Sequence, residues 1–316
     1  MTGTPQTSRP ECADNSPTGE GDPHDGRVTR GLESPELPAL VALVASGQVA
    51  VLTGAGLSTE SGIPDYRGPD GSTRRVVPMQ YAEFTGTSEA RQRYWARSFI
   101  GWQRFSRAEP NVGHREVALL QQRGLLRGII TQNVDGLHQA AGAQDVIELH
   151  GNLEDVICLT CGDRTSRASL HDRMDAANPH FAERVRAVVG DASRVSSQIR
   201  PDGDIVLDDD VVRTFHLQAC LVCGHDTLKP DVVFFGESVP KPKVEQAFAL
   251  VGGARALLVL GSSLAVMSGY RFVRRAHRDG IPVAIVTSSP SRGDSEASIR
   301  LHSRLGETLS ALADRL

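Results

Sequence analysis

The sequence lacks long apolar runs and a basic excess, and each absence excludes a class of protein. Its longest apolar runs, such as Ala256–Leu260, are far too short to span a bilayer. A net charge of -4 and a pI near 6.2 argue against nucleic acid as a main partner, because proteins that bind it usually concentrate Lys and Arg. We therefore expect no membrane span and no nucleic-acid partner.

The N-terminus also lacks the features of a targeting segment. It has no basic start followed by an apolar core, and its acidic residues are atypical of a mitochondrial leader. Cysteine is scarce: two Cys-x-x-Cys pairs hold four of the five cysteines, and Cys12 lies alone. This usage indicates metal binding rather than a disulfide framework. We therefore expect a reducing, cytoplasmic location.

What the sequence does contain is the composition of a globular enzyme. The 316 residues are 40% hydrophobic and 23% charged, which is enough for two domains or for one domain with an insertion. Residues 1–33 are rich in Pro, Gly, Ser, Thr and Asp and predict a disordered tail. We expect the catalytic domain over 34–316. It should begin with a helix that Ser34 caps, that has Pro35 at its first position and that Gly47 ends.

Short apolar runs alternate with helical patterns along this domain. The runs are Val49–Thr53, Gly128–Thr131, Val146–Leu149, Leu257–Leu260 and Val283–Thr287. This alternation predicts an α/β fold with a Rossmann-like, doubly wound parallel sheet. Ligands of such sheets bind outside the carboxyl ends of the strands, and here the residues that follow the runs are small or polar.

The Gly54-Ala55-Gly56 turn follows the first run. Glycines there would let backbone N–H groups approach a pyrophosphate at a helix N-terminus. By itself this signal is weak, because Thr59 replaces the third glycine of G-x-G-x-x-G and no acidic residue ends the second run to hold a ribose. The departure argues against an ordinary dehydrogenase. A tight turn without a ligand is an equal alternative.

Two polar segments and one histidine could hold the same ligand. Residues 58–68 could close over it, with Arg67 available for phosphate; the alternative is a solvated connector. Residues 131–138 bring amide and carboxylate groups to a strand end, where a nicotinamide amide could be bound; the alternative is an N-capping turn. His150 would project into the same crevice as a proton acceptor, although a lone histidine is more often structural.

The strongest pattern is the pair of Cys-x-x-Cys motifs, each followed by glycine, which predict two knuckles around one tetrahedral Zn2+ ion. Its ligands would be Cys158, Cys161, Cys220 and Cys223. Four thiolates leave no open position, so the zinc would be structural and a metallohydrolase is disfavoured. We expect a zinc-binding module at about 152–230, inserted in the sheet domain, with helices and an acidic loop around Asp208–Asp210. A redox dithiol or free cysteines are the minority alternative.

Together these motifs resemble the sirtuin family from about Ser34 to the C-terminus. The resemblance rests on GAGLSTESGIPDYRG from Gly54, TQNVDGLH from Thr131, ELHG from Glu148, the cysteine pairs, KPDVVFFGE from Lys229 and GSSL from Gly261. YWAR from Tyr94 and SGYRF from Ser268 look most like the class II branch. The resemblance implies a protein-lysine deacylase that consumes NAD and releases nicotinamide, O-acyl-ADP-ribose and free lysine.

The resemblance also implies roles for particular residues. His150 matches the family's general base, and Asn133 a second catalytic position that organises the ribose and the nicotinamide with Asp135. Cofactor positions would be Gly54, Ala55, Gly56, Ser58, Ile63, Pro64, Asp65, Tyr66, Arg67, Gln132, Asn133, Val134, Asp135, Gly261, Ser262, Ser263, Thr287, Ser288, Ser289 and Leu305. Thr287 departs from the asparagine that the family usually has, a departure that bears on NAD affinity.

The substrate implied is an acyl-lysine protein, bound as an extended peptide. Residues 232–237 resemble the family's substrate strand, which would pair with it by β-augmentation; the alternative is a plain core strand. Tyr94 and Arg97, three apart on a helix, could bind the carboxylate of a succinyl or glutaryl group; the alternative is an exposed helix face. Substrate positions would be Val233, Phe234, Phe235, Gly236, Glu237, Gly269, Tyr94 and Arg97.

Two rival functions stay open beside the deacylase. One is a mono-ADP-ribosyltransferase that uses the same NAD chemistry, and the other is a non-catalytic reader of NAD or of a peptide. A transferase would attach label from NAD covalently to protein, whereas deacylation would give soluble O-acyl-ADP-ribose. A reader would bind NAD without releasing nicotinamide.

Overall fold

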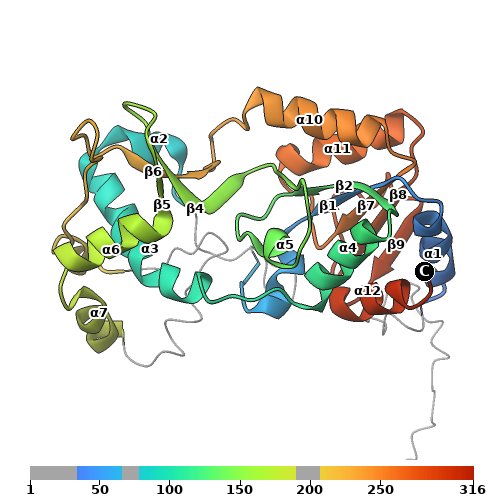
Figure 1. Ribbon diagram of the computed structural model, residues 1–316, viewed down its shortest axis with the longest axis horizontal. Coiled ribbons are helices and arrows are strands. Elements are labelled where there is room, and N and C mark those ends of the chain that lie inside the picture. Colours follow the sequence, from blue (N-terminus) through green and yellow to red (C-terminus); the bar gives the residue numbers. More distant parts are fainter. Residues whose placement is uncertain (1–33, 66–77, 190–206) are drawn as a thin grey trace, which may run out of the picture.

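The computed structural model describes residues 34–65, 78–189 and 207–316. The predicted tail, Tyr66 and Arg67 lie outside the described residues. Figure 1 shows two lobes, a larger one built on a parallel sheet and a smaller one built on an antiparallel sheet. Among the described residues, no helix combines the length and the apolar character needed to cross a membrane.

The larger lobe is built on a six-stranded parallel sheet in the order β3-β2-β1-β7-β8-β9. Its strands are β1 Val49–Thr53, β2 Leu126–Thr131, β3 Ile147–Glu148, β7 Ala256–Leu260, β8 Val283–Thr287 and β9 Ile299–His302. All five predicted runs form strands, and the predicted doubly wound sheet is confirmed. Strand β3 is shorter than its apolar run, and β9 was not predicted.

Successive side chains of each strand point to opposite faces of the sheet, so one strand supplies two cores. In β1, Val49 and Val51 belong to one core, and Ala50 and Leu52 belong to the other. Helices cover both faces (Figure 1), which is why these strands read as continuous apolar runs. The first face carries α1 Leu37–Ala45, α4 Val112–Gln122 and α12 Leu305–Ala313, and the second α10 Lys241–Gly252 and α11 Met267–Arg278.

Helix α1 begins later than predicted. The Ser34 carbonyl accepts the Leu37 amide at 3.1 Å, and its hydroxyl donates to the Glu36 carboxylate at 2.5 Å. Ser34 therefore stabilises a turn before the helix instead of capping it, and Leu37 is the first helical residue. The predicted end is confirmed, because Gly47 follows the last turn with φ of 71°.

The smaller lobe contains a three-stranded antiparallel sheet in the order β5-β4-β6. Its elements are β4 Gly151–Cys158, β5 Arg164–Ser166, β6 Leu228–Val232, α6 Arg167–Ala177, α7 Phe181–Val189 and α9 Asp209–Val212. The acidic loop expected around Asp208–Asp210 is a helix start instead. Asp208 is the N-cap of α9, and Asp209 and Asp210 lie in its first turn, where the helix dipole favours carboxylates.

A second chain segment completes this lobe. Helices α2 Tyr81–Gly86 and α3 Ser88–Phe105 precede β4 by many residues, yet Phe84, Trp95 and Phe99 share one core with residues of β4, α6 and α7. The Trp95 indole N–H donates to the Leu228 carbonyl of β6 at 2.8 Å. We call the antiparallel sheet and its helices, with α2 and α3, the zinc module.

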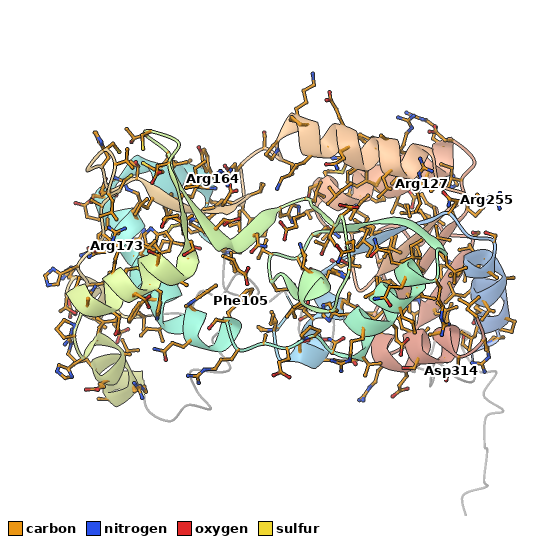
Figure 2. All side chains as sticks on the ribbon, in the orientation of Figure 1. Phe105, Arg127, Arg164, Arg173, Arg255 and Asp314 are labelled. Carbon is orange, nitrogen blue, oxygen red and sulfur yellow. The ribbon has the colours of Figure 1, made fainter. Side chains whose placement is uncertain are left out.

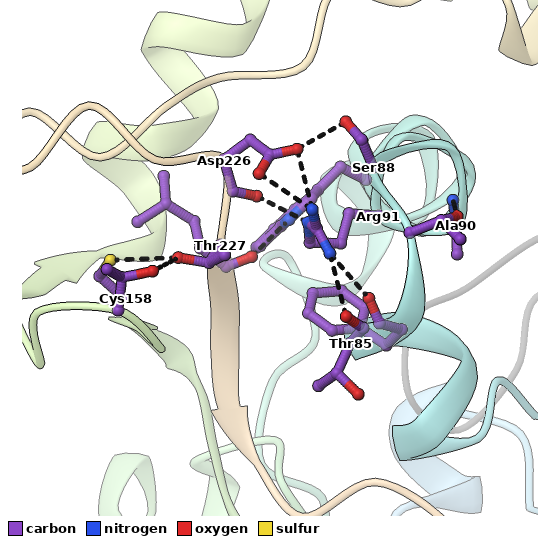
Figure 3. A network of polar contacts seen from close by, with 12 residues as sticks. Thr85, Ser88, Ala90, Arg91, Cys158, Asp226 and Thr227 are labelled. Atoms are coloured by element: carbon purple, nitrogen blue, oxygen red, sulfur yellow. Dashed lines mark hydrogen bonds and ion pairs between the residues drawn. The ribbon is translucent and has the colours of Figure 1, made fainter.

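Arg91 of α3 fastens the earlier segment to the second cysteine knuckle (Figure 3). Its guanidinium donates to both carboxylate oxygens of Asp226, at 2.9 and 3.0 Å, and to the Asp226 carbonyl at 3.0 Å. Ser88 donates to the same carboxylate at 2.5 Å. The neighbouring Thr227 hydroxyl lies 3.5 Å from the Cys158 sulfur, so α3 is connected to the cysteine cluster through two residues.

Figure 2 shows how side chains fill the two lobes. Arg164 and Arg173 lie on the zinc module, whereas Arg127 and Arg255 lie at the far end of the sheet lobe. Phe105, the last residue of α3, lies between the lobes and is buried in the core of the module. The module therefore has its own core, separate from the two cores of the sheet lobe.

Candidate active site

The strand order of the large sheet changes direction between β1 and β7. From β1 the chain proceeds to β2 and β3 on one side, and from β7 to β8 and β9 on the other. In open α/β sheets, ligands bind in the crevice outside the carboxyl ends of the strands at such a point. The loops that follow β1 and β7 therefore flank the expected site.

Glycines let these two loops touch. The Gly56 amide donates to the Gly261 carbonyl at 2.8 Å, and the Gly54 amide donates to the Leu260 carbonyl at 3.0 Å. A Cβ on Gly56 would lie 2.8 Å from the Gly261 oxygen, and one on Gly54 would lie 2.8 Å from the Ser262 Cβ. No larger residue fits at either position without moving the β7 loop.

The helix N-terminus expected at this turn is wrong. The Gly54 and Gly56 amides bond to the end of β7, so a pyrophosphate would contact other groups of the turn, and that contact stays a prediction. No α-helix begins at this turn: it leads into two 3-10 turns, Ala55–Leu57 and Thr59–Ser61. The sequence pattern was correct about close backbone approach, but the partner is another loop of the chain.

A network of side chains joins the β1 loop to the segment after β2. The Asn133 amide group donates to the Gly54 carbonyl at 3.1 Å and to the Ser58 hydroxyl at 2.9 Å. Ser58 donates to the Asp135 carboxylate at 2.6 Å, and Asp135 also accepts the Leu137 amide at 3.0 Å. Burial raises the pKa of Asp135, although the Ser58 and Leu137 hydrogen bonds oppose the rise. Four predicted site residues therefore meet here: Gly54, Ser58, Asn133 and Asp135.

Two buried histidines lie next to this network, with their rings near the hydroxyls of Thr53 and Ser58. The ring of His138 in α5, Leu137–Ala140, lies 2.9 Å from the Thr53 hydroxyl, and the ring of His114 in α4 lies 3.5 Å from the Ser58 hydroxyl. Burial lowers the pKa of His138 to about 4. Burial, with His138 and Arg115 nearby, lowers the pKa of His114 to about 3. Both rings are therefore neutral hydrogen-bonding groups at pH 7.

Neither His114 nor Asn111 was predicted from the sequence. The two form a capping box at the start of α4, and the Asn111 amide group also donates to the Leu57 carbonyl at 2.7 Å and to the Ser61 hydroxyl at 3.0 Å. The spacing Asn111-x-x-His114 is the local signal for the cap. Nothing local to α4 in the sequence indicates that the helix start would lie beneath the β1 loop.

His150 lies in the turn between β3 and β4, with both ring nitrogens in hydrogen-bond range of a partner. Its Nδ1 is 2.9 Å from the Gln132 carbonyl oxygen, and its Nε2 is 2.9 Å from the Ser268 hydroxyl. Burial lowers the pKa of His150; the Gln132 hydrogen bond opposes this effect, and Lys243 and Arg271 add to it. A neutral imidazole at pH 7 follows, which is the form that a general base requires.

Gln132 connects His150 to the point where the strand order reverses. Its side-chain amide donates to the Ser262 hydroxyl at 2.8 Å and to the Thr53 carbonyl at 3.2 Å. Its backbone carbonyl is the group that His150 contacts. One residue therefore ties the histidine to the loops after β1 and β7.

The predicted positions near the C-terminus lie on the same edge of the sheet. Thr287 is 5% exposed at the end of β8, its hydroxyl donates to the Ser289 carbonyl, and its own carbonyl accepts the Ser303 amide at 2.9 Å. Leu305 begins α12 and is buried close to Gly261. Ser263 follows β7 and is half-buried, and Ser288 follows β8 and is exposed.

Two predicted cofactor positions face the zinc module instead of the sheet. Ile63 is buried in the aromatic core of the module, and Val134 packs against the same core. The Val134 carbonyl also accepts the Leu153 amide of β4 at 3.0 Å. Ala55, Pro64 and Asp65 are half-buried in the loop after β1. Through Ile63 and Val134, the loops that border the crevice therefore contact the core of the module.

The expected substrate strand ends early. Strand β6 stops at Val232, and the Glu237 amide bonds to the Phe234 carbonyl at 3.0 Å, so the chain turns at Gly236, whose φ is 81°. An extended strand over 232–237 is therefore wrong. The segment still contacts the site, because the Val233 amide donates to the His150 carbonyl at 2.7 Å.

The rest of this segment is fixed by the module. The Phe235 carbonyl accepts the Tyr81 amide at 2.8 Å, and the Phe234 amide donates to the Glu237 carboxylate at 2.9 Å. Phe235 itself is 37% exposed, whereas Phe234 is buried. The ammonium of Lys229, which is buried, lies 3.1 Å from the Glu237 carboxylate. Phe235 is therefore an exposed side chain on a turn that hydrogen bonds hold in place.

The exposed helix face considered for Tyr94 is wrong. Tyr94 is 3% exposed, and its ring packs edge-on against Phe84 at 5.3 Å and lies 5.2 Å from the Phe234 ring. Arg97 on the next turn of α3 is half-buried. Tyr94 therefore lies in the core of the module, and Arg97 lies at the edge of that core.

The four cysteines of the module converge as the sequence predicts. Their sulfur atoms all lie within 4.8 Å of one another. The Cys158 and Cys223 sulfurs are 3.6 Å apart, and those of Cys161 and Cys220 are 3.7 Å apart. Thiolates at the usual Zn–S length around a tetrahedral ion would be separated by about 3.8 Å, so the cluster fits zinc.

The hydrogen bonds around Cys158 favour a bound thiolate. Burial raises its pKa, but the Thr227 hydroxyl and the amides of Cys161 and Thr160 outweigh that effect and lower the pKa to about 6. The short sulfur contacts join cysteines of different knuckles. A redox dithiol within one Cys-x-x-Cys pair is therefore disfavoured.

Comparison with known proteins assigns the fold to a family. A sequence profile described as the Sir2 family matches residues 54–268, which contain the β1 loop, His150, the four cysteines and the β7 loop. The chain belongs to the Sir2 family. The structure has the fold of that family, a parallel sheet with helices and a small antiparallel module that carries the four cysteines.

Curated Sir2 relatives match most of the chain. An NAD-dependent protein deacetylase 1 of Streptomyces coelicolor is 53% identical over 281 residues, which cover 89% of this chain and 90% of that protein. One of Mycobacterium avium is 49% identical and covers 89% and 96%. An NAD-dependent protein deacylase of Monosiga brevicollis is 47% identical over 85% of each chain.

Solved Sir2 structures agree with this Sir2 chain over nearly their whole length. One is Sir2 with a p53 peptide and NAD+, with a TM-score of 0.67 and 28% identity, covering 88% of this chain and 97% of that one. Another is a Sir2 bound to a propionylated peptide, with a TM-score of 0.67, 26% identity and the same coverage.

Proposed function

We propose that this Sir2 protein is an NAD-dependent protein-lysine deacylase that uses His150 as its general base. The activity is the one for which its bacterial relatives are named, NAD-dependent protein deacetylation. The observation that supports His150 is its contact with the Gln132 carbonyl. A carbonyl oxygen only accepts hydrogen bonds, so Nδ1 carries the proton and Nε2 carries the lone pair.

Bound NAD would supply the reactive ribose, from which nicotinamide leaves and to which the acyl group passes. In that reaction Nε2 of His150 would take the proton of a ribose hydroxyl. Asn133 and Asp135, which are held by Ser58, would hydrogen-bond the ribose and the nicotinamide amide. Ser262, fixed by Gln132, and Ser263 would hold the adenosine half.

The remaining predicted cofactor positions follow the same pattern of polar strand ends. We assign the loop from Ala55 through Asp65, Tyr66 and Arg67 to the pyrophosphate side, and Thr287, Ser288, Ser289 and Leu305 to the adenosine side. The donor set fits a dinucleotide, because hydroxyl and amide groups dominate it. Its only carboxylates, which would repel phosphate, are Asp65 and Asp135. Thr287 offers one hydroxyl, and that hydroxyl already bonds to Ser289.

The zinc ion would be structural and would take no part in the reaction. Four thiolates complete a tetrahedral shell and leave no position for water or substrate. The cysteines hold the turn after β4 and the turn before β6 together. The zinc therefore stabilises the antiparallel sheet from which the substrate segment continues.

The substrate would bind as an extended acyl-lysine peptide beside Val233–Glu237 and opposite Gly269. Solved Sir2 neighbours carry a p53 peptide or a propionylated peptide. Phe235 is exposed at this turn and is available for an apolar contact. Because backbone groups would supply most of the pairing, we expect broad tolerance of peptide sequence.

We place the chain in the class II branch, with an acidic acyl group as a candidate substrate. The support is the pair Tyr94 and Arg97, one turn apart on α3: Tyr94 is buried beside Phe234, and Arg97 is half-buried. A guanidinium and a phenol could bind a succinyl or glutaryl carboxylate. The hypothesis is tested with Arg97→Ala and Tyr94→Phe. Unchanged desuccinylation relative to deacetylation in both variants would refute it.

A reducing, cytoplasmic location is part of the same proposal. Four of the five cysteines would serve as zinc ligands, a use that requires reduced thiols. Zinc content after expression with and without a reducing agent tests this requirement.

The deciding experiment measures nicotinamide release from NAD with acetyl, longer-chain and acidic acyl-lysine peptides. His150→Ala should lower kcat/KM by about 10²–10⁴-fold and leave NAD binding intact. His180→Ala is the matched control, because His180 is an exposed histidine of the module. Label from NAD on protein would favour the ADP-ribosyltransferase, and NAD binding without nicotinamide release would favour the reader.

A further inference from the structure

The hydroxyl of Ser268 lies 2.9 Å from Nε2 of His150, on the nitrogen that must accept a proton. We propose that Ser268 is a positioning residue for this base, holding the imidazole by one hydrogen bond whose direction reverses when His150 takes up the proton. The inference rests on the proposed function, since it assigns a partner to the same base.

The direction of the hydrogen bond in the free enzyme follows from the other side of the ring. The Gln132 carbonyl lies 2.9 Å from Nδ1 and can only accept, so Nδ1 donates and Nε2 carries the lone pair. Ser268 must then donate its hydroxyl proton to Nε2. The base is therefore held from both sides, with its tautomer set by Gln132 and its accepting nitrogen faced by Ser268.

The same hydroxyl can serve the protonated base. A ribose hydroxyl must first replace Ser268 as the donor to the single lone pair of Nε2. When it gives its proton, that lone pair becomes an N–H bond and can no longer accept from Ser268. The Ser268 hydroxyl then turns and accepts from Nε2–H, because a hydroxyl is both donor and acceptor. Ser268 gains and loses no proton in this step, so it acts only through His150.

The charges around His150 make the Ser268 hydroxyl important as an acceptor for the protonated ring. Lys243 of α10 and Arg271 of α11 are the charged groups that act on the ring, and both disfavour an imidazolium. The start of α11 adds partial positive charge of the same sign. The Glu148 carboxylate, two residues before His150, instead accepts hydrogen bonds from Gln139 and Asn152. A hydrogen bond to Ser268 would therefore help His150 to hold its proton during the reaction.

The packing of α11 fixes Ser268 at this place. Ser268 is the second residue of the helix, and Gly269 follows it. A Cβ on Gly269 would lie 2.4 Å from the side-chain oxygen of Gln132, so a larger residue there would displace the Gln132 amide from its bonds to Thr53 and Ser262. The residue that orients Nδ1 of His150 is thus also the residue against which α11 packs to deliver Ser268 to Nε2.

The test compares Ser268→Ala, which removes the hydroxyl, with Ser268→Thr, which keeps it. Ser106→Ala is the control, because Ser106 is an exposed serine beyond the end of α3. In Ser268→Ala we expect kcat to fall about tenfold, with little change in the KM for NAD. The acid limb of the kcat/KM profile should move to lower pH, because a hydrogen bond to a charged ring is worth more than one to a neutral ring.

A second readout does not depend on activity. The 15N and 1H signals of the His150 ring, followed against pH in the free protein, report its pKa and its tautomer directly. We expect Ser268→Ala to lower the pKa of His150 further and to leave Nδ1 protonated. Ser268→Thr should restore both the ring titration and kcat, and Ser106→Ala should match the wild-type protein.

The two failures are distinguishable. If no acyl-lysine peptide stimulates nicotinamide release from the wild-type protein, the proposed function fails, while the ring titration still tests the Ser268 contact. If Ser268→Ala leaves the His150 titration and the acid limb unchanged, the positioning role is refuted. A higher KM for NAD with unchanged kcat and pH profile would refute it as well, since it would make Ser268 part of the cofactor contact alone.

Discussion

The two lobes are stabilised by different kinds of side chain. In the sheet lobe, β1, β7 and β8 are buried along their whole length, and aliphatic residues fill the cores on both faces. In the zinc module, β5 is largely exposed, and aromatic rings and the cysteine cluster take the place of a second core. A sheet of three short strands buries too little surface by itself and needs a staple.

The lobes also differ in how they treat polar groups. Beneath the crevice, the sheet lobe buries neutral groups, such as the rings of His114 and His138. The module buries charges and pairs them, as in the contact of Lys229 with Glu237. The buried Arg167 lies over the rings of Trp95 and Trp102. Chemistry in the crevice requires uncharged donors and acceptors that can respond to a ligand, whereas the module requires fixed contacts.

Loss of the metal should produce the largest difference between the two lobes. Cys161→Ser should abolish zinc binding and unfold the module, since structural zinc supplies roughly 10–16 kcal/mol in small domains. Amide exchange should rise across β4–β6, while β1 and β7 stay protected, and deacylation should be lost with the substrate segment. Zinc content and hydrogen exchange measure both effects. Cys12→Ser is the matched control; full zinc content in Cys161→Ser would contradict the prediction.

The second test uses acid, to which the crevice should respond more than the module. His114 and His138 titrate at a pKa of about 3 and about 4 when folded, and near 6.5 when unfolded. Below pH 6.5 the unfolded chain therefore binds more protons, and stability falls with pH by about 1.4 kcal/mol per pH unit for each histidine, down to the folded pKa.

Urea unfolding at pH 7, 6 and 5 measures this slope. His138→Gln can still donate to Thr53 and should reduce the loss of stability on acidification by about one histidine's share. His180→Gln, at an exposed position of the module, should not. Equal slopes in the three proteins would show that the crevice histidines do not control the acid response. Because each slope is compared with the wild type, any acid effect on the zinc site cancels.

The third test concerns close packing at the crevice. Gly56→Ala places a Cβ 2.8 Å from the Gly261 carbonyl oxygen, which should cost about 1–3 kcal/mol of stability and weaken NAD binding. Gly252→Ala in α10 meets no atom within 4 Å and should be neutral or stabilising by up to about 1 kcal/mol. Thermal unfolding and calorimetric titration with NAD distinguish them. Equal stability in both variants would count against loop-to-loop packing at Gly56.

The smallest effect is expected at the junction of α3 with the second knuckle. Arg91→Lys keeps the charge but loses the two-pronged contact with Asp226, which should lower stability by about 1 kcal/mol. Arg213→Lys changes an exposed pair with Asp210 and should stay within about 0.5 kcal/mol. Denaturant midpoints measure both. A loss as large for Arg213 as for Arg91 would show that burial does not distinguish these pairs.

The sheet was predictable because its signal is local. The run Val283–Thr287 matches β8 residue for residue, since a strand covered on both faces must be apolar throughout. The cysteine cluster was predictable because zinc imposes ligand type and spacing. By contrast, β9 was missed because its residues, Ile299–His302, alternate in polarity and lack an apolar run.

The substrate segment shows where the pattern misled. Val232 to Phe235 have the composition of a strand, yet Gly236 adopts a left-handed conformation and Glu237 turns back to bond Phe234. Composition describes what a segment prefers, whereas the antiparallel ladder of β6 ends at Val232, opposite Gly151, where β4 begins. The partner strand, and not the segment itself, set the boundary.

The sequence by itself determined the two-faced sheet, the metal ligands and the motifs of the family, because each of these depends on residue type at fixed spacing. Only the tertiary structure decided which groups face His150. Ser268 is 118 positions away in the chain, and the two meet because α11 packs against the end of β2. Such contacts depend on strand order and on close packing between elements, and no local pattern in the sequence encodes either.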